Sequence, residues 1–142
     1  MYHIRLVGGQ TPNEGYIEIK AFDYPFGGIC DDGFRDEEAN VICKMAGFPL
    51  GAEKAYVGSH FGNGNGPFLL DELNCQGHEN SILDCKFNPW RQHDCRVSEW
   101  AGVVCKLGMI YVIPLFKIYY LVNQHQKISL LYNPLVLQTA QC

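Results

Sequence analysis

Hydrophobic and polar positions alternate most regularly over residues 16–21, where every second side chain is apolar. The two sets face opposite sides of an extended chain, with Ile17, Ile19 and Ala21 on one side and Tyr16, Glu18 and Lys20 on the other. This two-residue period predicts a half-buried strand. Shorter apolar runs predict further strands at residues 4–7, 27–30, 67–73 and 102–105.

A helical period follows the third of these strands. Three acidic residues, Asp36 to Glu38, begin the segment, where negative charge favours the positive end of a helix dipole, and Asp36 is the expected N-cap. One face is then apolar, with Ala39, Ile42, Cys43 and Ala46, and Gly47 is expected to end the helix. The glycine-rich stretch FGNGNG, residues 61–66, predicts a turn.

Residues 107–142 differ in character from the part before them. Lys117 and Lys127 are the only acidic or basic residues of this segment, histidine aside. Its apolar run over 109–122 is shorter than the roughly 20 residues of a membrane-spanning helix and contains Pro114. A tethered buried strand is one alternative, but the absence of a period and of caps favours a disordered or artefactual apolar tail outside the globular unit 4–106.

Length and charge limit the functional classes. A chain of 142 residues predicts one domain. The net charge of -4 argues against a nucleic-acid partner, which requires a basic face. The N-terminal residues MYHIRLVGG carry no secretory leader. The chain is therefore expected to be a fragment of a larger secreted or membrane protein, or to have lost the exon that encodes its leader.

Six of the seven cysteines lie between residues 30 and 105, and none belongs to a CxxC pair. This spacing indicates disulfide cross-links rather than a metal clamp. Cytosolic thiols remain reduced, so the pattern predicts an extracellular location, with any membrane association provided by a parent protein. Six cysteines allow 15 pairings. The seventh, Cys142, is expected to be free or to form an intermolecular bond.

Three groups of charged residues carry candidate chemistry. Two are acidic: Asp31, Asp32 and Glu99, and then Asp71, Glu72 and Asp94. The third is basic and comprises Lys86, Arg91 and Arg96, with His93 beside them. On the residues alone, the first acidic group and the basic group are better explained as ordinary solvated surface, and a surface acidic patch is the alternative for the second acidic group. No catalytic signature accompanies them, because the GNGNG run lacks a P-loop lysine, the histidines lack zinc spacing and no serine lies in a GxSxG context.

Four stretches, in order along residues 4–105, resemble the scavenger receptor cysteine-rich (SRCR) domain. They are IRLVGGQTPNEGYIEI, CDDGFRDEEANVICKMAGF, FGNGNGPFLLDELNCQGHENSILDC and HDCRVSEWAGVVC. The resemblance implies an α+β fold, small and disulfide-stapled, in which a curved antiparallel sheet cradles one helix. It also implies the pairing of the six-cysteine form of the family: Cys30 with Cys95, Cys43 with Cys105, and Cys75 with Cys85.

The resemblance also gives the acidic groups a role. Some family members bind calcium at residues matching Asp31, Asp32 and Glu99. Members with a second cation site use the positions of Asp71, Glu72 and Asp94, usually as aspartate, aspartate and asparagine. Calcium is therefore the expected cofactor, and Lys86, Arg91 and Arg96 would form an anion-contacting rim beside it.

Three positions depart from the family pattern. Gly28 occupies a strand position where threonine is usual, Trp100 stands where aspartate is frequent, and Tyr16 stands where arginine is common. The tyrosine puts in doubt any anion contact assigned to that arginine.

The resulting expectation is a non-enzymatic, extracellular, scavenger-receptor-like binding module with a role in innate immunity. It would recognise polyanionic or protein ligands with the help of a cation. The alternative is an accessory SRCR domain in a fragment of a secreted enzyme, either a serine protease or a lysyl oxidase-like amine oxidase. A structural adhesion repeat is a third interpretation.

Overall fold

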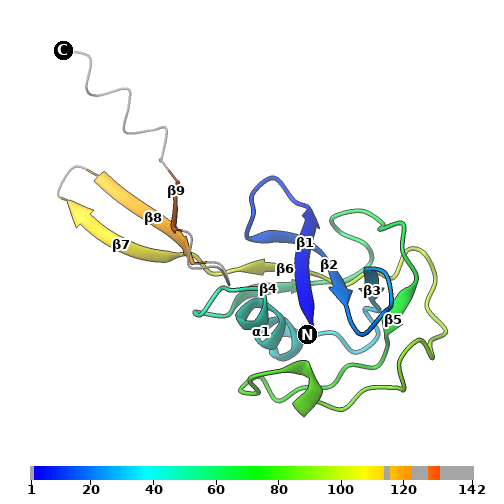
Figure 1. Cartoon of the computed structure of the whole chain (residues 1–142). Coiled ribbons are helices and arrows are strands. Elements are labelled where there is room, and N and C mark those ends of the chain that lie inside the picture. The colour runs from blue at the N-terminus through cyan, green and yellow to red at the C-terminus, as the bar shows by residue number, and fades with distance from the viewer. Residues whose placement is uncertain (1, 114–115, 123–127, 132–142) are drawn as a thin grey trace.

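The structure is a computed structural model that describes residues 2–113, 116–122 and 128–131. A curled six-stranded sheet and one helix form its main body (Figure 1). The elements of this body are β1 (His3–Gly8), β2 (Glu14–Lys20), β3 (Gly27–Ile29), α1 (Asp36–Met45), β4 (Ala52–Tyr56), β5 (Phe68–Leu70), the 3₁₀ helix η1 (Ile82–Asp84) and β6 (Gly102–Cys105).

The strands are ordered β4-β6-β2-β3-β5, and β1 also pairs with β2. All of these pairs are antiparallel except β3–β5, which is parallel. A parallel pair requires a long crossover, and here α1 and β4 lie in the chain between the two strands. The expected antiparallel sheet is therefore confirmed except at this one pair, which turns out to position the candidate site.

Helix α1 packs its apolar face against the sheet. Ala39, Ile42 and Cys43 are fully buried, as the helical period predicts, and Val41 is buried as well. The expected N-cap was wrong by one residue. Arg35 is the N-cap, its backbone N–H is accepted by Glu38 Oε2 at 2.8 Å, and Asp36 is the first helical residue. The side chain of Asp36 instead accepts the backbone N–H of Ala55, which ties the helix to β4.

Three disulfides staple this body, and they have the pairing that the family resemblance implies. The Cα atoms of Cys30 and Cys95 are 6.0 Å apart, those of Cys43 and Cys105 are 5.5 Å apart, and those of Cys75 and Cys85 are 4.8 Å apart. The Cys43–Cys105 bond joins α1 to β6, and both cysteines are fully buried. Cys142 lies outside the described residues.

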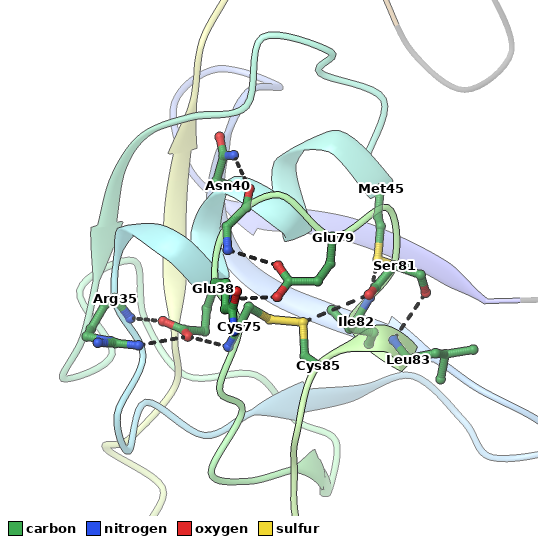
Figure 2. Close-up of a disulfide and its surroundings, with 12 residues drawn as sticks. Arg35, Glu38, Asn40, Met45, Cys75, Glu79, Ser81, Ile82, Leu83 and Cys85 are labelled. Carbon is green, nitrogen blue, oxygen red and sulfur yellow. Dashed lines mark hydrogen bonds and ion pairs between the residues drawn. A yellow bond between two sulfur atoms is a disulfide. The ribbon is translucent and has the colours of Figure 1, made fainter.

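The Cys75–Cys85 loop is fastened to the helix by polar contacts (Figure 2). The buried carboxylate of Glu38 accepts the backbone N–H of Cys75 at 2.7 Å through Oε1. Asn40 donates to the carbonyl of Gly77 at 2.6 Å, and Met45 Sδ accepts the N–H of Ile82. The helix therefore holds this loop along its length.

Two of the departures from the family pattern, Tyr16 and Gly28, lie against the third, Trp100. Trp100 is buried, and the ring of Tyr16 meets it edge-on with centroids 5.3 Å apart. A Cβ added to Gly28 would lie 2.6 Å from Cζ3 of the same indole. The indole of Trp100 therefore fits against β3 because Gly28 has no side chain. The glycine does not prevent β3 from forming.

Two features differ from the sequence-based expectations. Strand β4 was not predicted, and β5 is shorter than the predicted 67–73. The described residues of the segment 107–142 form an antiparallel sheet of three strands of their own: β7 (Gly108–Ile113), β8 (Phe116–Val122) and β9 (Ile128–Leu131). Within the described residues, no helix has the length and apolar character that crossing a membrane requires.

Candidate functional site

The parallel pair β3–β5 brings four acidic residues to one edge of the sheet. Parallel strands end on the same side, and Cys30 N donates to Leu70 O at 2.9 Å where these two end. Asp31 and Asp32 follow β3 in the chain, whereas Asp71 and Glu72 follow β5. The parallel direction of these strands therefore brings two residues of each predicted cation site to the same edge.

A third segment adds the remaining two carboxylates to this edge. Asp31 N donates to Glu99 O at 2.9 Å, and Cys30 and Trp100 form an isolated antiparallel bridge. The Cys30–Cys95 disulfide holds the same segment at its other end, and Asp94 precedes Cys95 directly. We refer to Asp31, Asp32, Asp71, Glu72, Asp94 and Glu99 together as the acidic edge.

Asp32 and Asp71 lie at the centre of the acidic edge. One carboxylate oxygen of each lies within 4.8 Å of the other and of the Cys30 and Cys95 sulfurs. Those sulfurs form a disulfide and are not thiolate ligands, so the oxygens are the donors available to a metal. Asp71 is only 2% exposed, and its Oδ1 accepts the N–H of Glu72 at 2.7 Å.

The charges of the acidic edge act on one another. Burial raises the pKa of Asp32 above its ordinary value, and the negative charges of Asp71, Glu99, Asp94 and Glu72, in that order, raise it further. These neighbours come from both predicted triads. The two triads therefore form one electrostatic cluster with Asp32 between them.

Two further members of the acidic edge, besides Asp71, accept backbone N–H groups. Asp31 Oδ2 accepts the N–H of Gly58, and Glu99 Oε2 accepts the N–H of Arg96 at 2.6 Å. These contacts leave further carboxylate oxygens unused. Among the described residues, no lysine or arginine forms an ion pair with any member of the acidic edge. An all-oxygen donor set with uncompensated negative charge fits a hard cation such as calcium.

The three predicted basic contacts are all exposed, and each has its own neighbours. Arg96 flanks the acidic edge through its backbone contact with Glu99. Arg91 lies over the ring of Tyr24, with its guanidinium carbon 5.2 Å from the centroid. Lys86 forms a backbone bridge with Asn74. Of these three, Arg96 has the contact that places it directly beside the acidic edge.

Arg35 is a basic residue near the acidic edge that the sequence analysis did not consider. A cavity of about 410 Å³ is lined by Gly33, Arg35, Glu72, Leu73 and Asn74. Glu72 of the acidic edge and Arg35 therefore line the same cavity, and the side chain of Arg35 is 58% exposed. The signal in the sequence was its position three residues after Asp32, between the acidic pair and the helix.

The profile of the scavenger receptor cysteine-rich domain matches residues 7–106. The chain belongs to the SRCR family. A "Scavenger receptor cysteine-rich domain superfamily protein" of Patiria pectinifera is 41% identical over 102 residues, which are 72% of this chain. Those residues are only 9% of that protein's length, so the chain corresponds to a small part of it.

Two solved structures support the assignment of this SRCR module. The third SRCR domain of murine neurotrypsin matches with a TM-score of 0.66 and 38% identity, covering 80% of this chain and 100% of that domain. The dimeric form of the SRCR domain of mouse MARCO matches with a TM-score of 0.59 and 37% identity, covering 72% of this chain and 93% of that one. Domains of this family are non-catalytic modules, typically extracellular, and generally bind protein or polyanionic ligands.

Proposed function

We propose that this SRCR module recognises polyanionic or protein ligands outside the cell with the help of a calcium ion held at the acidic edge. The observation that supports this proposal is the convergence of six carboxylates from three chain segments on one edge. Carboxylates gathered on one edge repel one another, so the arrangement costs free energy. A bound cation would lower this cost. Calcium accepts six to eight oxygen ligands, including carboxylates and water.

In this proposal the central residues bind the cation and the outer ones adjust the field around it. Asp32, Asp71, Asp31 and Glu99 are the ligand candidates, and Glu72 and Asp94 are members of the second predicted site. A bound calcium ion would offset part of this negative charge, and its remaining coordination positions could take an oxygen of a sulfate, phosphate or carboxylate group of the ligand. Arg96 and Arg35 flank the edge, where guanidinium groups bind such anions in a bidentate manner.

Isothermal titration calorimetry of the oxidised chain with calcium chloride tests the cation. We expect saturable uptake, and we expect Asp32→Ala to abolish it or weaken it sharply. Asp23→Ala is the matched control because Asp23 is an exposed aspartate in the turn between β2 and β3. Absence of calcium uptake at millimolar concentration would refute the calcium site and leave the acidic edge as a solvated surface.

Binding to a sulfated polysaccharide tests the ligand class. We expect immobilised heparin to retain the chain in calcium and to release it in chelator. Arg96→Ala should weaken retention more than Lys86→Ala, because Arg96 alone of the two contacts the acidic edge. Retention that is unchanged in chelator would separate polyanion binding from the cation.

A second candidate function is supported by the coverage of the relatives. The chain matches 9% of the Patiria pectinifera protein, and one matched structure is the third SRCR domain of neurotrypsin. These matches favour a module within a longer protein, and our second proposal is that this protein is a secreted enzyme in which the module is an accessory domain. Sequencing the complete transcript tests this, since a serine-protease triad or a copper-binding histidine cluster beside the module would favour the enzyme.

A further inference from the structure

A second hollow lies at the opposite end of β3 and β5 from the acidic edge. It has a volume of about 670 Å³ and is lined by residues of β1 and β2 and of two loops. Pro25 and Phe26 precede β3, and Asn65 and Gly66 come shortly before β5. Because the acidic edge follows the same two strands, the hollow is a separate site on the same domain.

The floor of the hollow is an ion pair on adjacent strands. Arg5 of β1 and Glu18 of β2 are direct partners in the strand register, and Arg5 Nε donates to Glu18 Oε2. The side chain of Glu18 is 8% exposed and that of Arg5 is 53% exposed. The guanidinium also lies over the ring of Phe26, 3.8 Å from its centroid. Both charged groups are therefore held in fixed positions.

This arrangement leaves hydrogen-bonding groups facing the hollow. In the described structure, Glu18 Oε1 and the two terminal amino groups of Arg5 form no hydrogen bond. Tyr16 adds a hydroxyl, and its ring is held edge-on against Trp100. Burial and then the charge of Glu18 raise the pKa of Tyr16, so its hydroxyl stays protonated and can both donate and accept. Asn65 contributes an amide at the rim.

We propose that this hollow binds a neutral saccharide. The ion pair of Arg5 and Glu18 carries no net charge, so it gives the hollow no net attraction for a ligand of either sign. An apolar ligand would desolvate both charged groups without replacing their hydrogen bonds. Each sugar hydroxyl can both donate and accept a hydrogen bond. The hollow offers matching partners in the guanidinium of Arg5, the carboxylate of Glu18 and the hydroxyl of Tyr16.

The departure from the family at Tyr16 supports the same assignment. Arginine is common at this position in the family, and a second guanidinium would give the hollow a positive charge. Tyrosine keeps it neutral and supplies an aromatic edge instead. The contact with Trp100, another departure, positions that ring. Tyr16 therefore adds an uncharged hydroxyl to the hollow beside the ion pair of Arg5 and Glu18.

Saturation-transfer NMR tests the proposal with the oxidised full chain in chelator, so that the calcium proposal does not affect the result. The probes are methyl glycosides of glucose, mannose, galactose, fucose and N-acetylglucosamine at millimolar concentration. We expect saturation transfer to at least one of them, and about tenfold weaker binding in Glu18→Gln. Tyr16→Phe, which removes only a hydroxyl, should also weaken binding.

Tyr56→Phe is the matched control, since Tyr56 lies on β4 outside the hollow, and Asp32→Ala controls for the acidic edge. Both should bind like the unmodified chain. Near-ultraviolet circular dichroism should show that all four variants fold. The proposal is overturned if no probe binds, if binding survives in both Glu18→Gln and Tyr16→Phe, or if sulfated glycosides bind the hollow in preference to neutral ones.

Discussion

Asp32 is the residue at which the two predicted carboxylate triads meet. The sequence and the family resemblance named all six residues but divided them into two sites. Only the parallel alignment of β3 and β5 shows that one carboxylate is near both sets. Strand direction depends on long-range pairing and has no local sequence signal, so the closeness of the two predicted sites could not have been predicted from the chain alone.

The raised pKa of Asp32 predicts a pH-dependent stability difference. In chelator at pH 7, Asp32→Asn should be more stable than the unmodified chain because it removes one repelling charge. The unfolded chain leaves this group near its ordinary value of 3.8. Protonation of Asp32 therefore favours the fold fully below pH 3.8, and this benefit is lost as the pH rises through the higher folded value.

Urea denaturation of both proteins from pH 3.5 to pH 7 measures the difference. The advantage of Asp32→Asn should grow as the pH rises from about 4 and disappear at the acid end. In calcium at pH 7 the order should reverse, because the asparagine variant loses a proposed ligand. An advantage that is constant across the whole pH range would contradict the assigned shift.

Gly28 carries a second prediction at the scale of one residue. Gly28→Ala places a Cβ 2.6 Å from the buried indole of Trp100, so the ring or the strand must move. Overpacking of this kind destabilises by about 1–3 kcal/mol. Thermal or urea unfolding measures the cost, and Trp100→Phe in the same chain should reduce the penalty of the alanine. Additive effects of the two substitutions would show that the predicted contact is absent.

At the scale of elements, the sequence predicts those that have a local signal. Alternation located β2, and β6 matches its predicted range of 102–105. Strand β4 has the sequence AEKAY, which lacks both alternation and branched residues, and it forms by pairing with β6. The N-cap was misassigned for a related reason. The aspartate at position 36 has capping chemistry, but its carboxylate binds the N–H of Ala55 in β4.

Helix α1 and the Cys75–Cys85 loop depend on Glu38 (Figure 2). This fully buried carboxylate accepts the N–H groups of Arg35 and Cys75 and contacts the Arg35 guanidinium. Glu38→Ala leaves both N–H groups without this acceptor, and each unpaired buried group costs about 1–3 kcal/mol. We therefore expect a destabilisation of about 2–6 kcal/mol in urea unfolding.

Glu37→Ala is the matched control for this substitution. Glu37 is the preceding residue, its side chain is 46% exposed, and it lies 3.9 Å from the Arg35 guanidinium. An exposed ion pair contributes about 0–1 kcal/mol, so this variant should unfold almost like the unmodified chain. Equal costs for the two alanines would mean that charge near the helix N-terminus, rather than the buried hydrogen bonds, stabilises this region.

At the scale of the molecule, the cysteine pattern predicted a disulfide-stapled fold, and the bridges act on very different lengths of chain. The sequence separations are 65 residues for Cys30–Cys95, 62 for Cys43–Cys105 and 10 for Cys75–Cys85. On the chain-entropy model, each long loop contributes about 4 kcal/mol and the short one about 3 kcal/mol. Their combined effect, about 11 kcal/mol, is comparable to the whole stability of a typical domain, about 5–15 kcal/mol.

Full reduction should therefore unfold the domain at room temperature. The experiment reduces the chain in denaturant, removes the denaturant while reductant is kept, and compares it with an oxidised sample treated in parallel. Trp100 is buried in the folded state, so its emission should shift to longer wavelength in the reduced sample alone. Near-ultraviolet circular dichroism should be lost with it. A reduced chain that keeps both signals and melts at an unchanged temperature would show that the apolar core beneath α1, rather than the bridges, supplies most of the stability.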